Sequence, residues 1–305
     1  MSGPVLNAFA MRTAHLAVRS LHAELCLFPK PGLVSKVDSG SHHDMDAGTF
    51  MRSLFALRHY FRRITLAGMQ DAEFATLCEL GIAAEARMLT ATSGVNTHRG
   101  AIFSLGLLCA ARGRAHAHGT ALSATALQAH LRSRWGEDLA QHAALTPGLT
   151  RRGQPPQTAV NPQDEQALQE VLSHGLQVRA RYAVAGAREQ AAHGLPAVFD
   201  IGLPRLRHSL QQGQSWQAAA LDTLFTLMAH VHDSNVLYRA GWRGMDLVQS
   251  QAQWFLAHGG CRSDGWENRA LACHRLFVAN RISPGGVADL LAATCFVHFS
   301  DTGAA

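Results

Sequence analysis

The sequence is poor in charge and almost without lysine. Charged residues make up 16% of the 305 residues, and Lys30 and Lys36 are the only lysines, so the net charge of +5 comes mostly from arginine. The arginines are scattered, and no basic run of five or more residues occurs. Because nucleic-acid-binding proteins gather basic residues into a patch or stripe, we expect no nucleic-acid partner.

Paired cysteines and long apolar runs are also missing. The six cysteines never approach the Cys-x-x-Cys spacing, which favours reduced thiols of a cytosolic protein over a disulfide framework or a zinc site. No apolar run reaches 18 residues, and the first twenty residues lack the pattern of a signal peptide. We therefore expect a cytoplasmic protein with no membrane partner.

Strand signals are nearly absent, and helical periodicity dominates. Phe50, Leu54, Leu57 and Phe61 follow the spacing of one helix face, and Gly68 and Gly113 mark expected helix ends. The other expected helices span 72–92, 98–111, 122–133, 164–185, 215–231, 244–257, 266–280 and 285–298. With 47% hydrophobic residues, the pattern predicts an all-α protein, a single-domain bundle of about ten helices over residues 1–305.

Two further features concern the organisation of this domain. The stretch 146–163 holds four of the ten prolines and little apolar content, which predicts a surface loop inserted in the domain. The segment 98–111 is apolar on almost every side, which is typical of a helix at the centre of a bundle.

Two expected helices begin with glycine where a helix usually closes its own end. If Thr97 and Ser283 are the N-caps, Gly100 and Gly286 occupy the third helical position, where a capping box has Glu or Gln. Glycine leaves room for another group to approach the backbone N–H atoms, and the helix dipole favours an anion there. The pattern predicts phosphate sites, and the alternative is that the glycines let helices cross closely.

Carboxylates and histidines gather in the segment 28–50. Asp46 is expected to cap a helix from residue 47, and Pro29 and Pro31 flank Lys30 in a stiff loop. His42 and His43 beside Asp44 offer a transition-metal site, but their spacing does not match a helical zinc pair. Magnesium held by carboxylates and phosphate oxygens fits the aspartates better.

Other polar residues lie within apolar segments. They are Glu85, Arg188, Glu189, Asp233, Asn235 and Arg239. Because an unpaired buried charge is costly, each either joins a structural ion pair or serves a ligand. Together they suggest an internal polar pocket among the helices.

Seven ordered blocks resemble the triphosphoribosyl-dephospho-CoA synthase family, which builds a prosthetic-group precursor for citrate lyase and malonate decarboxylase. The blocks are PKPGLV (29–34), GSHHDMD (40–46), GIAAEARML (81–89), GVNTHRGAIFSLGLL (94–108), GAREQAAHGLPAV (186–198), DSNVLYRAG (233–241) and ISPGGVADLLA (282–292). The second and fourth blocks are closer to the malonate decarboxylase branch. Ser234, Gln190 and Leu195 depart from the pattern, where threonine, a smaller residue and phenylalanine are expected.

The resemblance implies that ATP donates its triphosphoribosyl group to a ribose hydroxyl of 3′-dephospho-CoA and releases adenine. The product would pass to the acyl carrier protein of malonate decarboxylase or, alternatively, of citrate lyase. A homodimer is possible. Two other functions stay open at this point: a metal-dependent hydrolase of phosphorylated or ribosylated substrates, and a non-enzymatic partner of an acyl carrier protein.

Candidate roles follow from the needs of such a transfer. Asp44 or Glu189 is the candidate base, and His42 is the candidate acid for departing adenine. Asp44, Glu85 and Asp233 are candidate ligands of Mg²⁺. The candidate nucleotide and phosphate-binding residues are Lys30, Asn96, Thr97, Arg99, Gly100, Arg188, Asn235, Arg239, Ser283, Gly285 and Gly286.

Overall fold

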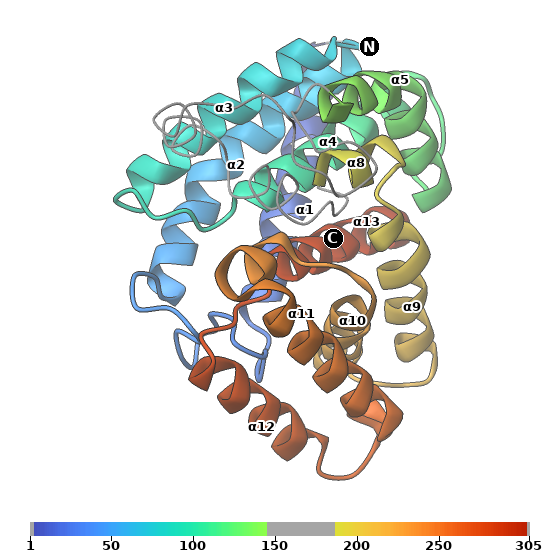
Figure 1. Cartoon of the computed structure of the whole chain (residues 1–305). Coiled ribbons are helices and arrows are strands. Elements are labelled where there is room, and N and C mark those ends of the chain that lie inside the picture. Colours follow the sequence, from blue (N-terminus) through green and yellow to red (C-terminus); the bar gives the residue numbers. More distant parts are fainter. Residues whose placement is uncertain (1–2, 145–186, 304–305) are drawn as a thin grey trace, which may run out of the picture.

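The computed structural model describes residues 3–144 and 187–303, and these residues form α-helices joined mostly by short connections, with one long connection over residues 26–46 (Figure 1). The helices are α1 (Gly3–Leu25), α2 (Ala47–Met69), α3 (Phe74–Ala91), α4 (Arg99–Ala117), α5 (Ala124–Ala144), α8 (Ala187–Ala192), α9 (Leu203–Gln211), α10 (Trp216–His230), α11 (Ser234–Ala257), α12 (Trp266–Ala279) and α13 (Gly285–Thr302). No strand occurs in the described ranges, so the all-α prediction is confirmed. The loop expected at 146–163 and the helix expected at 164–185 lie outside them.

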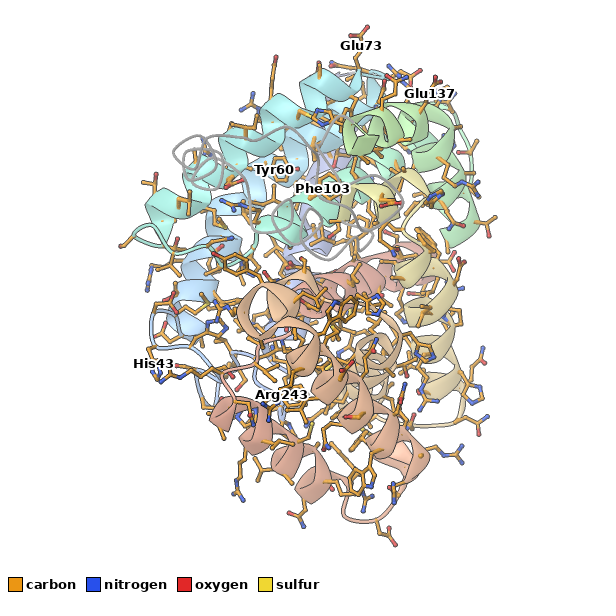
Figure 2. All side chains as sticks on the ribbon, viewed as in Figure 1. His43, Tyr60, Glu73, Phe103, Glu137 and Arg243 are labelled. Carbon is orange, nitrogen blue, oxygen red and sulfur yellow. The ribbon has the colours of Figure 1, made fainter. Side chains whose placement is uncertain are left out.

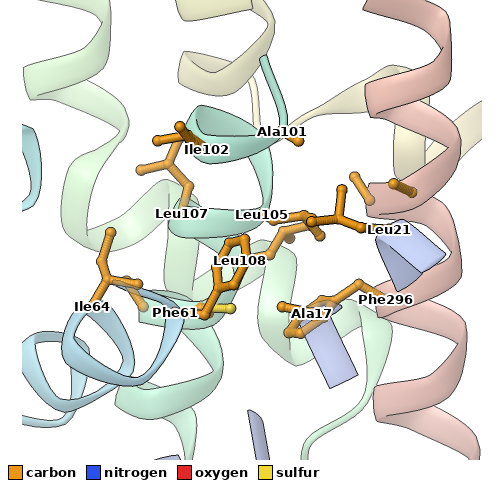
Figure 3. Packing of buried hydrophobic residues seen from close by; sticks show 14 of the residues in the cluster. Ala17, Leu21, Phe61, Ile64, Ala101, Ile102, Leu105, Leu107, Leu108 and Phe296 are labelled. Carbon is orange, nitrogen blue, oxygen red and sulfur yellow. The ribbon is translucent and has the colours of Figure 1, made fainter. Parts of the chain in front are cut away.

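Helix α4 is the centre of the first half of the bundle. It packs against α1, α2, α3, α5, α8 and α13, and its buried residues lie on every side of the helix, as the sequence predicts. Leu105 and Leu108 of α4 meet Phe61 of α2 and Phe296 of α13 in the core shown in Figure 3. Burial of side chains of this size stabilises the fold by roughly 1.5–3 kcal/mol each.

Helix α13 joins the two halves of the structure. Ala292 and Phe296 belong to the core around α4, whereas Leu291 and Cys295 belong to a second core built mainly from α10, α11 and α12. Figure 1 shows α13 between the α1–α5 group and the α9–α12 group. The N-terminus of α13 therefore has to be compatible with both groups.

Glycines set the crossing of α2 and α4. A Cβ atom at Gly68 would overlap the carbonyl of Ala110, and a Cβ atom at Gly113 would overlap the carbonyl of Thr65. The helix end expected at Gly68 lies one residue later, at Met69, whereas the end expected at Gly113 was wrong, because α4 continues to Ala117. The cost of glycine inside a helix, up to about 1 kcal/mol relative to alanine, is offset by the close approach of the two backbones.

Replacement of Gly68 tests this close approach. We expect Gly68→Ala to lower the free energy of unfolding by about 1–3 kcal/mol, because the added methyl group must push two backbones apart. The matched control is Gly81→Ala in α3, where the nearest atom to the new Cβ is the Tyr60 hydroxyl at 4.0 Å. That variant should gain about 0.5–1 kcal/mol from helix propensity. Urea unfolding with an unchanged m value measures the change in unfolding free energy for each variant. Equal changes for Gly68→Ala and Gly81→Ala would contradict the role of Gly68 in the close packing of α2 and α4.

Candidate active site

Most of the predicted site residues line one large cavity. Its volume is about 1550 Å³, and apolar residues such as Leu77 and Ile102 share the lining with the polar ones. Tyr60 and Phe103, labelled in Figure 2, line it from α2 and α4. The predicted site residues in the lining are His42, Asp44, Glu85, Asn96, Thr97, Arg99, Gly100, Asp233, Asn235, Arg239, Ser283, Gly285 and Gly286.

Lys30 lies in the protein interior and not at the cavity wall. Its side chain is only 1% exposed, and its Nζ lies 2.6 Å from Glu24 Oε1 and donates a second hydrogen bond to the Glu24 carbonyl. Lys30 thus neutralises a buried carboxylate, and it is not part of the cavity lining. Glu189, on the short helix α8, is also absent from this lining, and the Arg188 side chain lies outside the described residues.

The N-terminus of α4 is closed by a residue of another helix. The helix begins at Arg99, one residue later than expected, and the side chain of its N-cap residue, His98, makes no capping hydrogen bond. Instead, Asp289 of α13 accepts a hydrogen bond from the Ala101 N–H. A Cβ atom at Gly100 would overlap this carboxylate, so the glycine makes room for Asp289.

The N-terminus of α13 is closed in the same way. Asp233 Oδ2 accepts a hydrogen bond from the Val287 N–H at 2.8 Å, and its Oδ1 accepts from Asn235 and Val236 at 2.8 and 3.2 Å. One carboxylate therefore caps both α11 and α13. A Cβ atom at Gly286 would lie 3.1 Å from Asp233 Oδ2, which explains the glycine there.

These contacts bear on two predictions. At the helix ends near Gly100 and Gly286, carboxylates of the protein already accept the Ala101, Gly286 and Val287 N–H groups, so a phosphate there would have to replace or share these bonds. Asp233 is correspondingly poorly suited to bind metal, since both of its oxygens accept backbone hydrogen bonds. Sequence reasoning missed Asp289, although a lone carboxylate in an apolar helix is the same signal that singled out Glu85.

The carboxylates at this end of the cavity influence one another. Burial raises the pKa of Asp289 well above its ordinary value, and the nearby carboxylates Glu24 and Asp233 raise it further. Burial also raises the pKa of Asp233, although its backbone hydrogen bonds act in the opposite direction. Asp289, which lines the cavity, therefore holds its proton more readily than an exposed aspartate.

A histidine and two further charged residues lie elsewhere on the cavity wall. His42 Nε2 lies 2.8 Å from Ser283 Oγ, and its Nδ1 lies 3.7 Å from Asp44 Oδ1. Burial, followed by the charge of Arg239, lowers the pKa of His42. Asp44 itself is exposed, with 60% of its side chain accessible, so it is the carboxylate of this group that a ligand reaches most easily.

The remaining polar residues of the 94–108 block are held by partners on α2, on α3 and within the block itself. Arg99 forms an ion pair with Glu85, and the Asn96 side chain accepts a hydrogen bond from the Arg99 N–H at 3.2 Å. Thr97 donates to Ser53 Oγ at 2.7 Å rather than capping α4. Glu85 thus fixes the direction of the Arg99 guanidinium at the cavity wall.

The candidate metal ligands do not form a joint site. Within the described parts of the chain, no group of three or more His, Cys, Asp or Glu side chains is arranged to hold a metal ion. Glu85 is paired with Arg99, Asp233 caps two helices, and Asp44 lies within ion-pair distance of His42 alone among the residues that the structure describes. Nor does any helix among the described residues have the length and apolar character to cross a membrane.

Comparisons with known proteins agree on one family. The profile of the ATP:dephospho-CoA triphosphoribosyl transferases matches residues 10–304. Two relatives called probable 2-(5''-triphosphoribosyl)-3'-dephosphocoenzyme-A synthase are similar to the chain. The relative from Stutzerimonas stutzeri is 40% identical, and the match covers 94% of this chain and 91% of the relative. The relative from Acinetobacter calcoaceticus is 34% identical, and the match covers 96% of this chain and 92% of the relative. A synthase of the same name from Pectobacterium atrosepticum is 35% identical, covering 95% and 88%. No solved structure gives a significant match.

These matches make the helical protein an enzyme of the transferase class. More narrowly, the chain belongs to the family of ATP:dephospho-CoA triphosphoribosyl transferases, because the family profile covers nearly its whole length. The cavity accordingly is the candidate active site, since most of the blocks that carry the resemblance meet at its wall.

The raised pKa of Asp289 predicts a pH-dependent stability. A carboxyl group with a raised pKa stabilises the fold when protonated, and this contribution is lost as the pH rises above about 4 toward the folded-state pKa. Asp289→Asn still accepts the Ala101 hydrogen bond but does not ionise. The variant should therefore gain stability relative to the parent between pH 4 and pH 8, measured as the difference in Tm.

Asp46→Asn is the control with the opposite sign. Asp46 caps α2 as expected, and hydrogen bonds from Thr49 lower its pKa. The ionised Asp46 carboxylate stabilises the fold above the ordinary pKa of aspartate, and this stabilisation disappears as the pH falls. Asp46→Asn should therefore be less stable than the parent at neutral pH only. A Tm difference for Asp289→Asn that does not change with pH would contradict the buried, protonated carboxyl group.

Proposed function

We propose that this enzyme transfers the triphosphoribosyl group of ATP to a ribose hydroxyl of 3′-dephospho-CoA and releases adenine. The observation that carries this proposal is the convergence of the family blocks on one cavity, together with the family match over residues 10–304. A volume of about 1550 Å³ exceeds the roughly 300–1,000 Å³ of ordinary ligand pockets, as two large substrates require.

The triphosphate needs positive charge that the helix ends do not provide. Arg99 and Arg239 both line the cavity, and Arg239 is exposed there. Arginine suits this task because its planar guanidinium group binds phosphate oxygens in pairs. Asn96 and Asn235, close to these arginines in the sequence, add neutral hydrogen-bonding groups to the same wall.

The transfer breaks the bond between adenine and ribose and forms a bond from the acceptor hydroxyl to the same carbon. A base takes the hydroxyl proton, and an acid gives a proton to the departing adenine. Asp44 is the better supported base, because it is exposed at the cavity wall while Glu189 is not part of the lining. The lowered pKa of His42 makes it a weak candidate acid, and Asp289, with its raised pKa, suits that role better.

Magnesium enters with ATP in this proposal. Mg²⁺ in phosphate-transfer sites keeps several waters and uses one or two carboxylates beside the substrate phosphates, so a preformed cluster is not needed. Asp44 is the proposed protein ligand, since Glu85 and Asp233 are already engaged. The ion would supply charge neutralisation for the triphosphate.

The sequence blocks indicate which acyl carrier protein receives the product. The wording of residues 40–46 and 94–108 favours the malonate decarboxylase acyl carrier protein as the destination, with citrate lyase as the alternative. The proposal includes a cytoplasmic, homodimeric enzyme that passes its product into acyl carrier protein modification.

The reaction itself is tested with purified protein, ATP, Mg²⁺ and 3′-dephospho-CoA. Free adenine should form only when the acceptor is present, and the acceptor should gain the mass of a triphosphoribosyl group. Adenine or phosphate formed without the acceptor would instead indicate a hydrolase, and binding without turnover would refute the transferase activity.

Asp44→Asn tests the proposed base. We expect kcat to fall by about 100-fold or more, the usual contribution of a positioned acid or base, because the amide neither accepts the hydroxyl proton nor binds Mg²⁺ well. Asp246→Asn is the control, since Asp246 is exposed on α11 and lies outside the cavity lining. Turnover of Asp44→Asn within about threefold of the parent, with a large loss in Glu189→Gln, would move the role to Glu189.

A further inference from the structure

Two large aromatic side chains lie exposed on the cavity wall near the start of α11. Tyr238 is 44% exposed and Trp242 is 42% exposed, and both line the main cavity. Aromatic surface left in water is unfavourable, and a concave, partly charged cavity is a place where a ligand covers such surface. We call Tyr238 and Trp242 the aromatic wall.

The backbone holds this wall in a defined place. The Asp233 cap fixes the first turn of α11, and Gly241 interrupts the helix directly before Trp242 with φ 61° and ψ −163°. A residue with a Cβ atom rarely adopts this backbone conformation. The His232 ring meets the Trp242 ring edge to face, with 5.3 Å between centroids and an interplanar angle of 88°. The indole is thus oriented before any ligand binds.

The neighbours of the aromatic wall indicate the chemistry of its ligand. Arg239 follows Tyr238 in the sequence and lines the same cavity, and Asn235 lies one helical turn earlier. An aromatic face next to a guanidinium group matches a ligand that has a flat ring at one end and phosphates at the other. A purine nucleotide is such a ligand.

We propose that Tyr238 and Trp242 stack against the adenine ring of a nucleotide substrate and so contribute to its binding. This inference rests on the proposed function, in which ATP and 3′-dephospho-CoA both carry adenine. Stacking on aromatic side chains recognises any base through its flat face, and the amide and histidine groups nearby add hydrogen bonds. The same surface holds the base whichever of the two substrates provides it.

Equilibrium binding tests the proposal without turnover. The dissociation constants of ATP and of 3′-dephospho-CoA are measured separately by calorimetry for the parent and for Trp242→Ala. At least one should rise by about tenfold, the typical effect of removing one stacked aromatic side chain. Trp242→Phe should stay within about threefold, because phenylalanine retains a stacking face. Tripolyphosphate, which has no base, should bind both proteins equally.

The control is Trp254→Ala. Trp254 lies on the same helix with 45% exposure, but it packs against His258 and lies outside the cavity lining. This variant should leave both nucleotide affinities unchanged. It separates loss of stacking from general effects of removing an exposed tryptophan of α11.

The outcomes distinguish the possibilities. If Trp242→Ala raises the dissociation constant of ATP alone, the aromatic wall binds the adenine that departs. If it raises the dissociation constant of 3′-dephospho-CoA alone, the aromatic wall binds the acceptor. Unchanged affinity for both, equal losses in Trp242→Ala and Trp242→Phe, or an equal loss for tripolyphosphate would overturn the proposal. Absence of adenine release by the parent enzyme would refute the proposed function, but the binding measurements would still decide whether the wall binds purines.

Discussion

The cavity depends on two aspartates that accept backbone N–H groups at helix N-termini, among them the starts of helices distant from them in the sequence. A helix start leaves several backbone N–H groups without partners, and burying them unpaired is costly. Asp233 satisfies such groups in both α11 and α13, and Asp289 satisfies one in α4. Because α13 belongs to both cores, these bonds determine how the two halves of the bundle enclose the cavity.

The glycines at these helix starts have a structural reason that differs from phosphate binding. Gly100 and Gly286 leave room for a carboxylate, as Gly68 and Gly113 leave room for a backbone. In the proposed function, phosphate is therefore recognised by side chains such as Arg99 and Arg239, which line the cavity and have longer reach.

Part of the candidate site was predictable from the sequence because its residues are polar groups within apolar segments. Such groups must find partners or a ligand, so Glu85 and Arg239, which line the cavity, were identified without a structure. Lys30 was predicted to bind phosphate from a loop stiffened by two prolines, yet it pairs with Glu24 in the core. Composition cannot distinguish a buried ion pair from a ligand site, because both place charge in apolar surroundings.

The sequence by itself determined the helical class, the central position of α4, the Asp46 cap and the family. These properties depend on local periodicity, local hydrogen bonds and the order of motifs. Only the tertiary structure decided that Asp233 caps α13 and Asp289 caps α4, that Gly68 and Gly113 mark crossings, and that Tyr238 and Trp242 face a cavity. Each of these depends on contacts between helices distant in sequence, and no local pattern encodes the partner of such a contact.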